Sequence, residues 1–358
     1  MKIAHVAPLY ESVPPKLYGG TERIIAYLVD GLVELGEEVT LFSSADAETK
    51  AALAPVRDQA LRLDPHPLKS PIAAHLSMLD EVRRRADEFD IIHFHLSHFI
   101  HFPFFEQMPE KTVTTPHGRL DYKDLAGAYE RWPSFPMISI SHRQRQPLGR
   151  ANWAGTIHHG LPPDLYRPLP VRDEAAGGYL AFLGRLSRDK RPDRAIEIAR
   201  RSGLPLKIAA KVGEDDRAYF HETIEPLIDG IKVEYIGEIG EAGKEAFLGN
   251  AAALLFPIDW PEPFGLVVIE AMACGTPVIA WDEGAMSEII DEGVTGFIVR
   301  SLDQAVAAVD RVPALDRGRV RAVFEERFSA SRMVRDYAAI YARLAGLNSA
   351  GRVLESLA

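Results

Sequence analysis

Short apolar segments suited to buried strands alternate along this chain with segments of helical periodicity, and few folds accommodate that pattern. Its first instance lies within residues 2–43. A strand-like run, Lys2–Ala7, precedes a helix with Thr21 as its N-cap and Gly36 just after its last turn. Glu38–Ser43 is the next strand. This βαβ unit predicts parallel strands, because parallel neighbours need such a crossover.

The alternation continues on both sides of a proline-rich segment, residues 160–170, which we interpret as a linker. The further expected strands are Asp90–Phe94, Thr112–Thr115, Met137–Ile140, Gly155–His158, Gly178–Leu183, Leu206–Ala210, Lys232–Ile236, Ala253–Phe256, Pro277–Ala280 and Phe297–Val299. Further helices are expected around Asp193–Arg201, Arg217–Asp229, Gly240–Asn250, Leu266–Cys274, Met286–Asp291 and Ser331–Leu344. The pattern predicts an α/β protein of two Rossmann-like, doubly wound domains that face each other across a cleft. We expect these domains over residues 1–165 and 166–328, with a last helix in 329–358 that packs on the N-terminal domain.

Composition excludes several classes of protein. The 358 residues suit two domains, and the net charge of −10 argues against nucleic-acid binding. A single cysteine, Cys274, excludes a disulfide framework and a four-thiolate zinc site. No apolar run is long enough to span a membrane, and the chain starts on a strand, not on a signal peptide. We therefore expect a cytoplasmic protein.

The most informative stretch is residues 259–280, where a proline and a glycine precede an apolar helix. Pro263 can open that helix, and the N–H groups of Phe264, Gly265 and Leu266 would form an anion site at its start. Glu262 lies at the mouth of this site, although acidic residues are common at helix starts in any case.

Glu270 interrupts the apolar face of the same helix and needs a partner if it is buried. One carboxylate beside an anion site and another deeper along the helix suit a ligand that carries both phosphates and hydroxyls. A nucleotide sugar has both.

These residues carry a resemblance to a known family. The stretch EPFGLVVIEAMACGTPVIA, with Glu262 and Glu270 separated by seven residues, resembles the paired-glutamate signature of retaining glycosyltransferases of the GT-B fold, family 4. GGTER at 19–23, TTPHG at 114–118, GRLSRDK at 184–190 and EGAMSEIIDEGVTGFIV at 283–299 resemble other motifs of that family, in its order. The resemblance implies that the C-terminal domain binds a nucleotide-sugar donor and the N-terminal domain an acceptor.

The resemblance assigns the loop 184–190, Gly184 included, to the diphosphate of the donor, with Arg185 and Lys190 as its cations. Two cations there would neutralise the charge that develops on the leaving group. The loop is also basic at other positions, so a solvated basic loop is the alternative interpretation. The family often has glycine where this chain has Arg191, which leaves the shape of the loop open.

The resemblance also assigns roles to further residues. Gly19 and Gly20 would approach the donor phosphates or the acceptor, and His117 would contact the transferred sugar. Pro263, Phe264, Gly265 and Leu266 would bind the donor diphosphate, Glu262 the sugar hydroxyls and Glu270 the ribose hydroxyls. The alternative roles are an ordinary turn for the two glycines and a backbone-bonded histidine for His117.

Two motifs resemble metal sites. His93 and His95 share one face of an expected strand, in the histidine-rich run 93–101. No carboxylate or thiol joins them locally, so we expect a structural or acceptor-lining role. The acidic triplet Glu214–Asp216 resembles the metal site of a different glycosyltransferase fold. GT-B enzymes hold diphosphate with cations and helix dipoles, so we expect no cofactor and no essential metal.

The expected function is transfer of a hexose, with retention of configuration, from a nucleotide diphosphate sugar to an acceptor hydroxyl of unknown identity. UDP-glucose or a similar UDP-hexose is the favoured donor. The alternatives are a GT-B epimerase acting on a nucleotide sugar and a non-catalytic nucleotide-sugar binding protein. A dehydrogenase is disfavoured, because no GxGxxG follows an expected strand. Arginine clusters at 83–85 and 143–150 leave weak contact with a membrane surface open.

Overall fold

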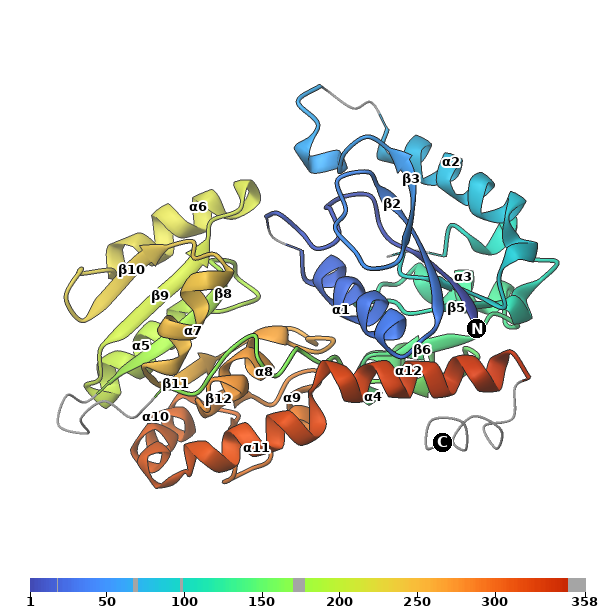
Figure 1. The fold of residues 1–358 in the computed structure, drawn as a ribbon. Coiled ribbons are helices and arrows are strands. Elements are labelled where there is room, and N and C mark those ends of the chain that lie inside the picture. Colours follow the sequence, from blue (N-terminus) through green and yellow to red (C-terminus); the bar gives the residue numbers. More distant parts are fainter. Residues whose placement is uncertain (18, 67–69, 97–98, 170–177, 347–358) are drawn as a thin grey trace. The chain divides into compact units, whose positions relative to one another are not determined.

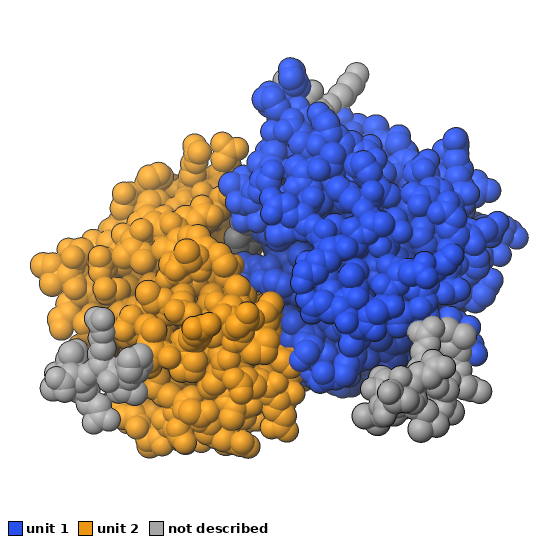
Figure 2. All heavy atoms as spheres, viewed as in Figure 1, with its two compact units in different colours: residues 1–160, 330–358 blue, residues 161–329 orange. Residues whose placement is uncertain are grey.

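A computed structural model describes residues 1–17, 19–66, 70–96, 99–169 and 178–346 of the chain. The chain divides into two compact units, shown in different colours in Figure 2. Unit 1 comprises Met1–Gly160 and the segment that starts at Ala330, and unit 2 comprises Leu161–Ser329. The divisions therefore fall at 160/161 and 329/330, where the sequence analysis placed them at 165/166 and 328/329. Each unit is described separately below.

Unit 1 is built on a seven-stranded parallel sheet with the strand order β3-β2-β1-β4-β5-β6-β7 (Figure 1). Its strands are β1 (Lys2–Val6), β2 (Glu38–Ser44), β3 (Ala52–Arg57), β4 (Ile91–Phe94), β5 (Thr112–Thr114), β6 (Met137–Ser139) and β7 (Trp153–Thr156). Its helices are α1 (Gly20–Glu34), α2 (Pro71–Arg84), α3 (Leu125–Arg131), α4 (His142–Arg145) and α12 (Ala330–Leu344). The strand order reverses between β1 and β4, which is the switch point where doubly wound sheets bind ligands at the carboxyl ends of their strands.

The last helix, α12, belongs to unit 1 although unit 2 precedes it in the sequence. It packs against α1, and its apolar stripe, which includes Met333 and Tyr337, is buried. A Cβ added at Gly31 of α1 would lie 2.6 Å from Val334, so glycine is what allows the two helices to approach so closely. The tyrosine hydroxyls of this helix reach the sheet, as described below.

Unit 2 is built on a six-stranded parallel sheet with the strand order β10-β9-β8-β11-β12-β13 (Figure 1). Its strands are β8 (Tyr179–Arg185), β9 (Leu206–Lys211), β10 (Val233–Gly237), β11 (Ala251–Phe256), β12 (Val278–Trp281) and β13 (Gly296–Val299). Its helices are α5 (Pro192–Ser202), α6 (Arg217–Tyr219), α7 (Glu241–Gly249), α8 (Leu266–Ala273), α9 (Met286–Ile289), α10 (Leu302–Arg311) and α11 (Arg317–Arg327). Here the order reverses between β8 and β11.

The two parallel sheets with their helices confirm the expected α/β fold of doubly wound sheets. Two local expectations were wrong. Helix α1 starts at Gly20 with Gly19 as its N-cap and no side-chain cap, so Thr21 is not the N-cap. The expected helix over 217–229 is short: α6 is followed by a π-helical turn, Phe220–Ile224, and a 3-10 turn that contains Pro226, which has no N–H to continue a helix. Among the described residues, no helix is both long and apolar enough to cross a bilayer.

Candidate functional site

In unit 2, the loop after β8 meets the loop after β11, the two strands that flank the switch point. Lys190, from the first loop, forms an ion pair with the Glu262 carboxylate from the second. The Trp260 indole N–H donates to Glu262 Oε2 at 3.0 Å, and the Lys190 ammonium lies 4.6 Å from the centre of the Trp260 ring. Lys190 and Glu262 are both largely buried, with side chains 15% and 12% exposed. The structure thus brings these two predicted residues together where the topology favours a ligand.

The segment at 283–285 fixes the backbone of Glu262. The Ala285 N–H donates to the Glu262 carbonyl at 3.0 Å. Gly284 has φ +56°, and a Cβ there would lie 2.2 Å from the same carbonyl oxygen. Only glycine therefore allows this close approach, which gives the EGA motif after β12 a role in holding Glu262.

Helix α8 starts beside this ion pair. Gly265 is its N-cap with φ +90°, and Pro263 and Phe264 precede it, with the Phe264 ring buried 6.2 Å from that of Phe328. The first N–H groups of a helix have no partner within it, and the helix dipole makes this end favourable for an anion. Leu266, the first helical residue, is partly exposed.

Arg185, at the end of β8, does not contact Glu262. Its guanidinium lies 3.2 Å from Asp189 and 3.7 Å from Asp216, and its side chain is 40% exposed. Burial raises the pKa of Asp216, and the charge of Arg185 opposes that shift. Two members of the acidic triplet at 214–216 are in ion pairs, Asp216 with Arg185 and Glu214 with Arg217 at 3.5 Å. Gly184, just before Arg185, leaves open space where a side chain would be.

Arg191 adopts a left-handed backbone conformation, with φ +54°. Its guanidinium pairs with Asp193 and Asp259, and the hydrogen bonds that it donates to Asp193 are the main reason that its pKa is raised. The left-handed conformation is the one that glycine adopts most readily, so the loop keeps a glycine-type shape here without a glycine.

Glu270 is 3% exposed, and the partner that its burial requires is Lys244, whose ammonium lies 2.9 Å from Glu270 Oε1. Lys244 also lies 3.5 Å from Glu241, and the Tyr166 hydroxyl donates to Glu241. Lys244 is not among the site residues predicted from the sequence. The signal was there: a carboxylate in an apolar helix face requires a cation, and α7 contains only this lysine.

In unit 1, Gly19 and Gly20 lie at the start of α1, next to β1. A Cβ at Gly19 would lie 2.7 Å from Glu22 Oε2 and 2.9 Å from Pro15, so the loop is tightly packed. Glu22 is buried, and burial raises its pKa to about 7. A carboxylate with its pKa raised to about 7 in the first turn of α1, packed against the glycine loop, was not predicted from the sequence.

His117, from the loop after β5, joins a group of histidines at the switch point of this sheet. His95 Nδ1 lies 3.0 Å from His117 Nε2, and His95 Nε2 lies 3.0 Å from His5 Nδ1. The pKa of His117 is lowered by burial, and that of His5 is lowered to about 3 for the same reason. Neutral imidazoles therefore form this group.

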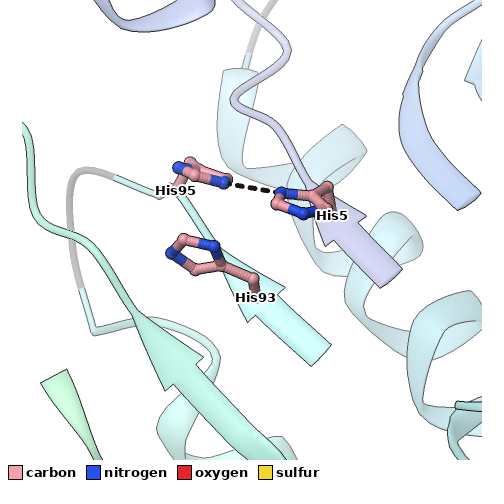
Figure 3. A group of neighbouring side chains, drawn as sticks. All are labelled: His5, His93 and His95. Carbon is pink, nitrogen blue, oxygen red and sulfur yellow. Dashed lines mark hydrogen bonds between the residues drawn. The ribbon is translucent and has the colours of Figure 1, made fainter. Parts of the chain in front are cut away.

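His93 lies beside this chain of rings, as Figure 3 shows for His5, His93 and His95. Its Nδ1 lies 2.6 Å from the Tyr341 hydroxyl of α12 and its Nε2 lies 2.8 Å from the Thr115 hydroxyl. The ligand atoms of His5, His93 and His95 lie within 4.8 Å of one another, a spacing that a metal site also has. All three rings take part in hydrogen bonds through ring nitrogens, and the group contains histidines alone, so the structural or acceptor-lining role stays a prediction.

The arginine cluster at 83–85 forms ion pairs with neighbouring carboxylates on the protein surface. Arg84 lies 2.7 Å from Asp80, and Arg85 donates three hydrogen bonds to Glu88. Such exposed pairs contribute little to stability. Contact of these arginines with a membrane surface stays a prediction.

Two doubly wound units in one chain, each with polar side chains at its switch point, are the architecture of the GT-B fold, which this chain shares with a solved glycosyltransferase. Residues 18–186 match the model of Glycosyltransferase Family 4, and residues 175–323 match that of Glycosyl transferases group 1. The chain therefore belongs with the group 1 and family 4 glycosyltransferases.

Individual relatives agree with this assignment. An uncharacterized glycosyltransferase of Methanocaldococcus jannaschii is 26% identical over 356 residues, which cover 87% of this chain and 89% of the relative. The crystal structure of AviGT4, a glycosyltransferase involved in avilamycin A biosynthesis, has a TM-score of 0.71 and 26% identity, covering 96% of this chain and 98% of that one. The Anabaena protein HepE, in complex with UDP and glucose, has a TM-score of 0.70 at 18% identity, covering 95% and 98%, and shares the fold.

Proposed function

We propose that this glycosyltransferase transfers a hexose, with retention of configuration, from a nucleotide diphosphate sugar to an acceptor hydroxyl. The observation that carries the proposal is the contact between Lys190 and Glu262 at the switch point of unit 2, beside the start of α8. A UDP-hexose, UDP-glucose above all, is the favoured donor, and the structural neighbour in complex with UDP and glucose supports that choice.

In this proposal the diphosphate binds between the 184–190 loop and the start of α8. Arg185 and Lys190 supply positive charge, and the N–H groups of Gly265 and Leu266 point with the helix dipole toward the anion. The negative charge of the leaving diphosphate grows as the glycosidic bond breaks, so donors already in place stabilise the transition state more than the ground state. No metal or cofactor has a step in this scheme.

The ion pair also suggests how the site exchanges partners. Before the donor binds, Lys190 and Glu262 neutralise each other. A phosphate oxygen competes for the Lys190 ammonium, and this leaves Glu262 able to accept a hydrogen bond from a sugar hydroxyl while Trp260 still holds its Oε2. Lys190 thus keeps an anionic partner, and Glu262 keeps hydrogen-bond donors in place of its cation, so neither buried charge is left without a polar contact.

The remaining residues complete the proposed site. Glu270, neutralised by Lys244, accepts hydrogen bonds from the ribose hydroxyls. His117 contacts the transferred sugar, and Gly19 and Gly20 approach the donor phosphates or the acceptor. With no enzymic nucleophile assigned, the leaving phosphate assists attack on the same face of the sugar, so the product keeps the anomeric configuration.

The test is release of nucleoside diphosphate from a panel of donors, with product analysis by NMR. The wild type should hydrolyse one donor slowly, and Lys190→Ala and Glu262→Ala should each lower that rate by roughly 100- to 1,000-fold. Lys207→Ala is the matched control, because Lys207 lies in the same unit but pairs with Glu234 at a half-exposed surface.

Equal rates in wild type and both variants would refute the site. Sugar interconversion without diphosphate release would instead identify an epimerase, and donor binding without turnover a binding protein. An inverted anomeric centre in the transfer product would refute retention alone.

A further inference from the structure

Three histidines on neighbouring elements form one hydrogen-bonded chain at the switch point of unit 1. His5 lies on β1, His95 directly follows β4, and His117 follows β5; these three strands are adjacent in the sheet. The two links, His5 Nδ1 to His95 Nε2 and His95 Nδ1 to His117 Nε2, are both 3.0 Å long. His95 thus uses both of its nitrogens to connect the other two rings.

The chain couples the proton positions of its members. A neutral imidazole has one donor and one acceptor nitrogen, so fixing the proton of one ring fixes those of its partners. Two arrangements are consistent with the links. In the first, His5 Nδ1 donates to His95, His95 Nδ1 donates to His117 Nε2, and His117 carries its proton on Nδ1. In the second, every proton is reversed.

The inner end of the chain decides between the two arrangements. His5 is completely buried, and its Nε2 has no hydrogen-bond partner among the residues that the structure describes. In the second arrangement this atom is an N–H donor with nothing to accept its proton. In the first it is only an unused acceptor, and the N–H without an acceptor lies on His117 Nδ1 instead. The His117 side chain is partly exposed whereas His5 is completely buried, so a ligand can supply an acceptor at His117 but not at His5.

We propose that His5 and His95 are positioning residues that hold His117 in the tautomer with its proton on Nδ1. His117 Nδ1 is also buried without a hydrogen-bond partner among the described residues. In this tautomer, the N–H group at the His117 end of the histidine chain can therefore donate to a bound ligand. An oxygen of the transferred sugar is that acceptor, and this part of the inference rests on the proposed function. The other tautomer would present a lone pair to the sugar instead.

His93 provides the matched control. It is as buried as His5, and its ring centre lies 3.9 Å from that of His95, but both of its nitrogens contact hydroxyl groups, those of Tyr341 and Thr115. It is therefore a neighbour of the chain and not a member of it.

The first measurement is the tautomeric state of His117, read from two-bond 1H–15N correlation spectra of the full-length protein labelled with 15N-histidine. The wild type should show His117 with its proton on Nδ1. His5→Leu should abolish that preference, whereas His5→Asn, whose side-chain amide can replace the Nδ1 donor, should retain it. His93→Gln should leave His117 unchanged. A proton on Nε2 of His117 in the wild type would overturn the proposal, whatever the activity.

The second measurement is diphosphate release. His5→Leu should lower kcat about tenfold with KM for the donor little changed, the loss expected for one misplaced hydrogen bond in the transition state. His5→Asn should have a kcat close to that of the wild type, and His93→Gln should not lower kcat. If the proposed function fails, no variant turns over, but the tautomer measurement still stands.

A metal ion on His5, His93 and His95 is the competing explanation. Zinc added to the metal-free protein would then bind with one-to-one stoichiometry, His93→Gln would abolish binding as fully as His5→Leu, and the histidine chain would be refuted. A variant that fails to fold is recognised by its loss of cooperative thermal unfolding. If His5→Leu fails to fold, kcat is compared between His5→Asn and the wild type instead.

Discussion

The two sheets of this protein have the same topology around their switch points but satisfy their buried polar groups in different ways. In unit 1 the carboxyl ends of the strands carry neutral rings, with the pKa values of His93 and His95 lowered mainly by burial. In unit 2 the corresponding edge carries ion pairs, Lys190 with Glu262 and Arg185 with two aspartates. Charged side chains can exchange a carboxylate for a phosphate, whereas neutral rings suit neutral hydroxyl groups. The same fold thus offers two edges of different chemistry.

The largest expected effect tests the ion pairs of unit 2. Lys244→Met leaves the buried Glu270 carboxylate without its cation, and should lower the free energy of unfolding by about 3–5 kcal/mol. Urea unfolding of the full-length protein measures this. Lys207→Met, which breaks the half-exposed pair with Glu234, should cost less than about 1 kcal/mol. Adding Glu270→Gln to Lys244→Met should restore most of the loss; if it does not, the pair is not what stabilises this region.

An intermediate effect tests the glycine loop of unit 1. The pKa of Glu22 is raised from 4.5 to about 7, so the folded state favours the protonated carboxyl. The stability that this group contributes is complete below pH 4.5 and is lost as the pH rises toward 7, by at most about 3.5 kcal/mol at about 1.4 kcal/mol per pKa unit. Glu22→Gln should remove that loss, so the variant should gain stability relative to wild type between pH 4.5 and 7. The exposed Glu81→Gln should show no such trend. A parallel pH dependence in Glu22→Gln and wild type would contradict the raised pKa.

The smallest effect concerns Arg191, where unit 2 combines backbone strain with ion pairing. Arg191→Ala keeps the left-handed backbone and removes the pairs with Asp193 and Asp259, whereas Arg191→Gly also relieves the strain. The glycine variant should therefore unfold at higher urea concentration than the alanine variant, by about 1 kcal/mol in free energy. Equal stabilities would show that the backbone relaxes when the pairs are absent.

Features that depend on local sequence were the ones that could be predicted. The first βαβ unit and helix α8 were placed within one or two residues, and the stop at Gly36 was confirmed by its φ of +86°. Strand β3 was missed because Pro55 interrupts it; β3 lies at the edge of the sheet, where a missing N–H is tolerated. The start of α1 was misplaced because a good capping residue, Thr21, lies inside the helix.

Pairings between distant residues were beyond sequence reasoning. The need for a cation beside Glu270 could be inferred, but that Lys244 supplies it depends on how α7 and α8 pack. The histidine run was recognised, yet its connection to His5 spans 90 residues and exists only because β1 and β4 are neighbours. Side-chain types were visible in the sequence, and their partners were decided by the topology.

The position of α12 has a consequence for how the protein is made. The hydroxyls of Tyr337 and Tyr341 contact Thr115 and His93, so the polar interior of unit 1 includes groups that the ribosome adds only after all of unit 2. At roughly 5–20 residues per second, this delay is on the order of ten seconds or more. During that interval the nascent N-terminal half has to remain incomplete, with the face that α12 will cover still uncovered, while the inserted half is already able to fold.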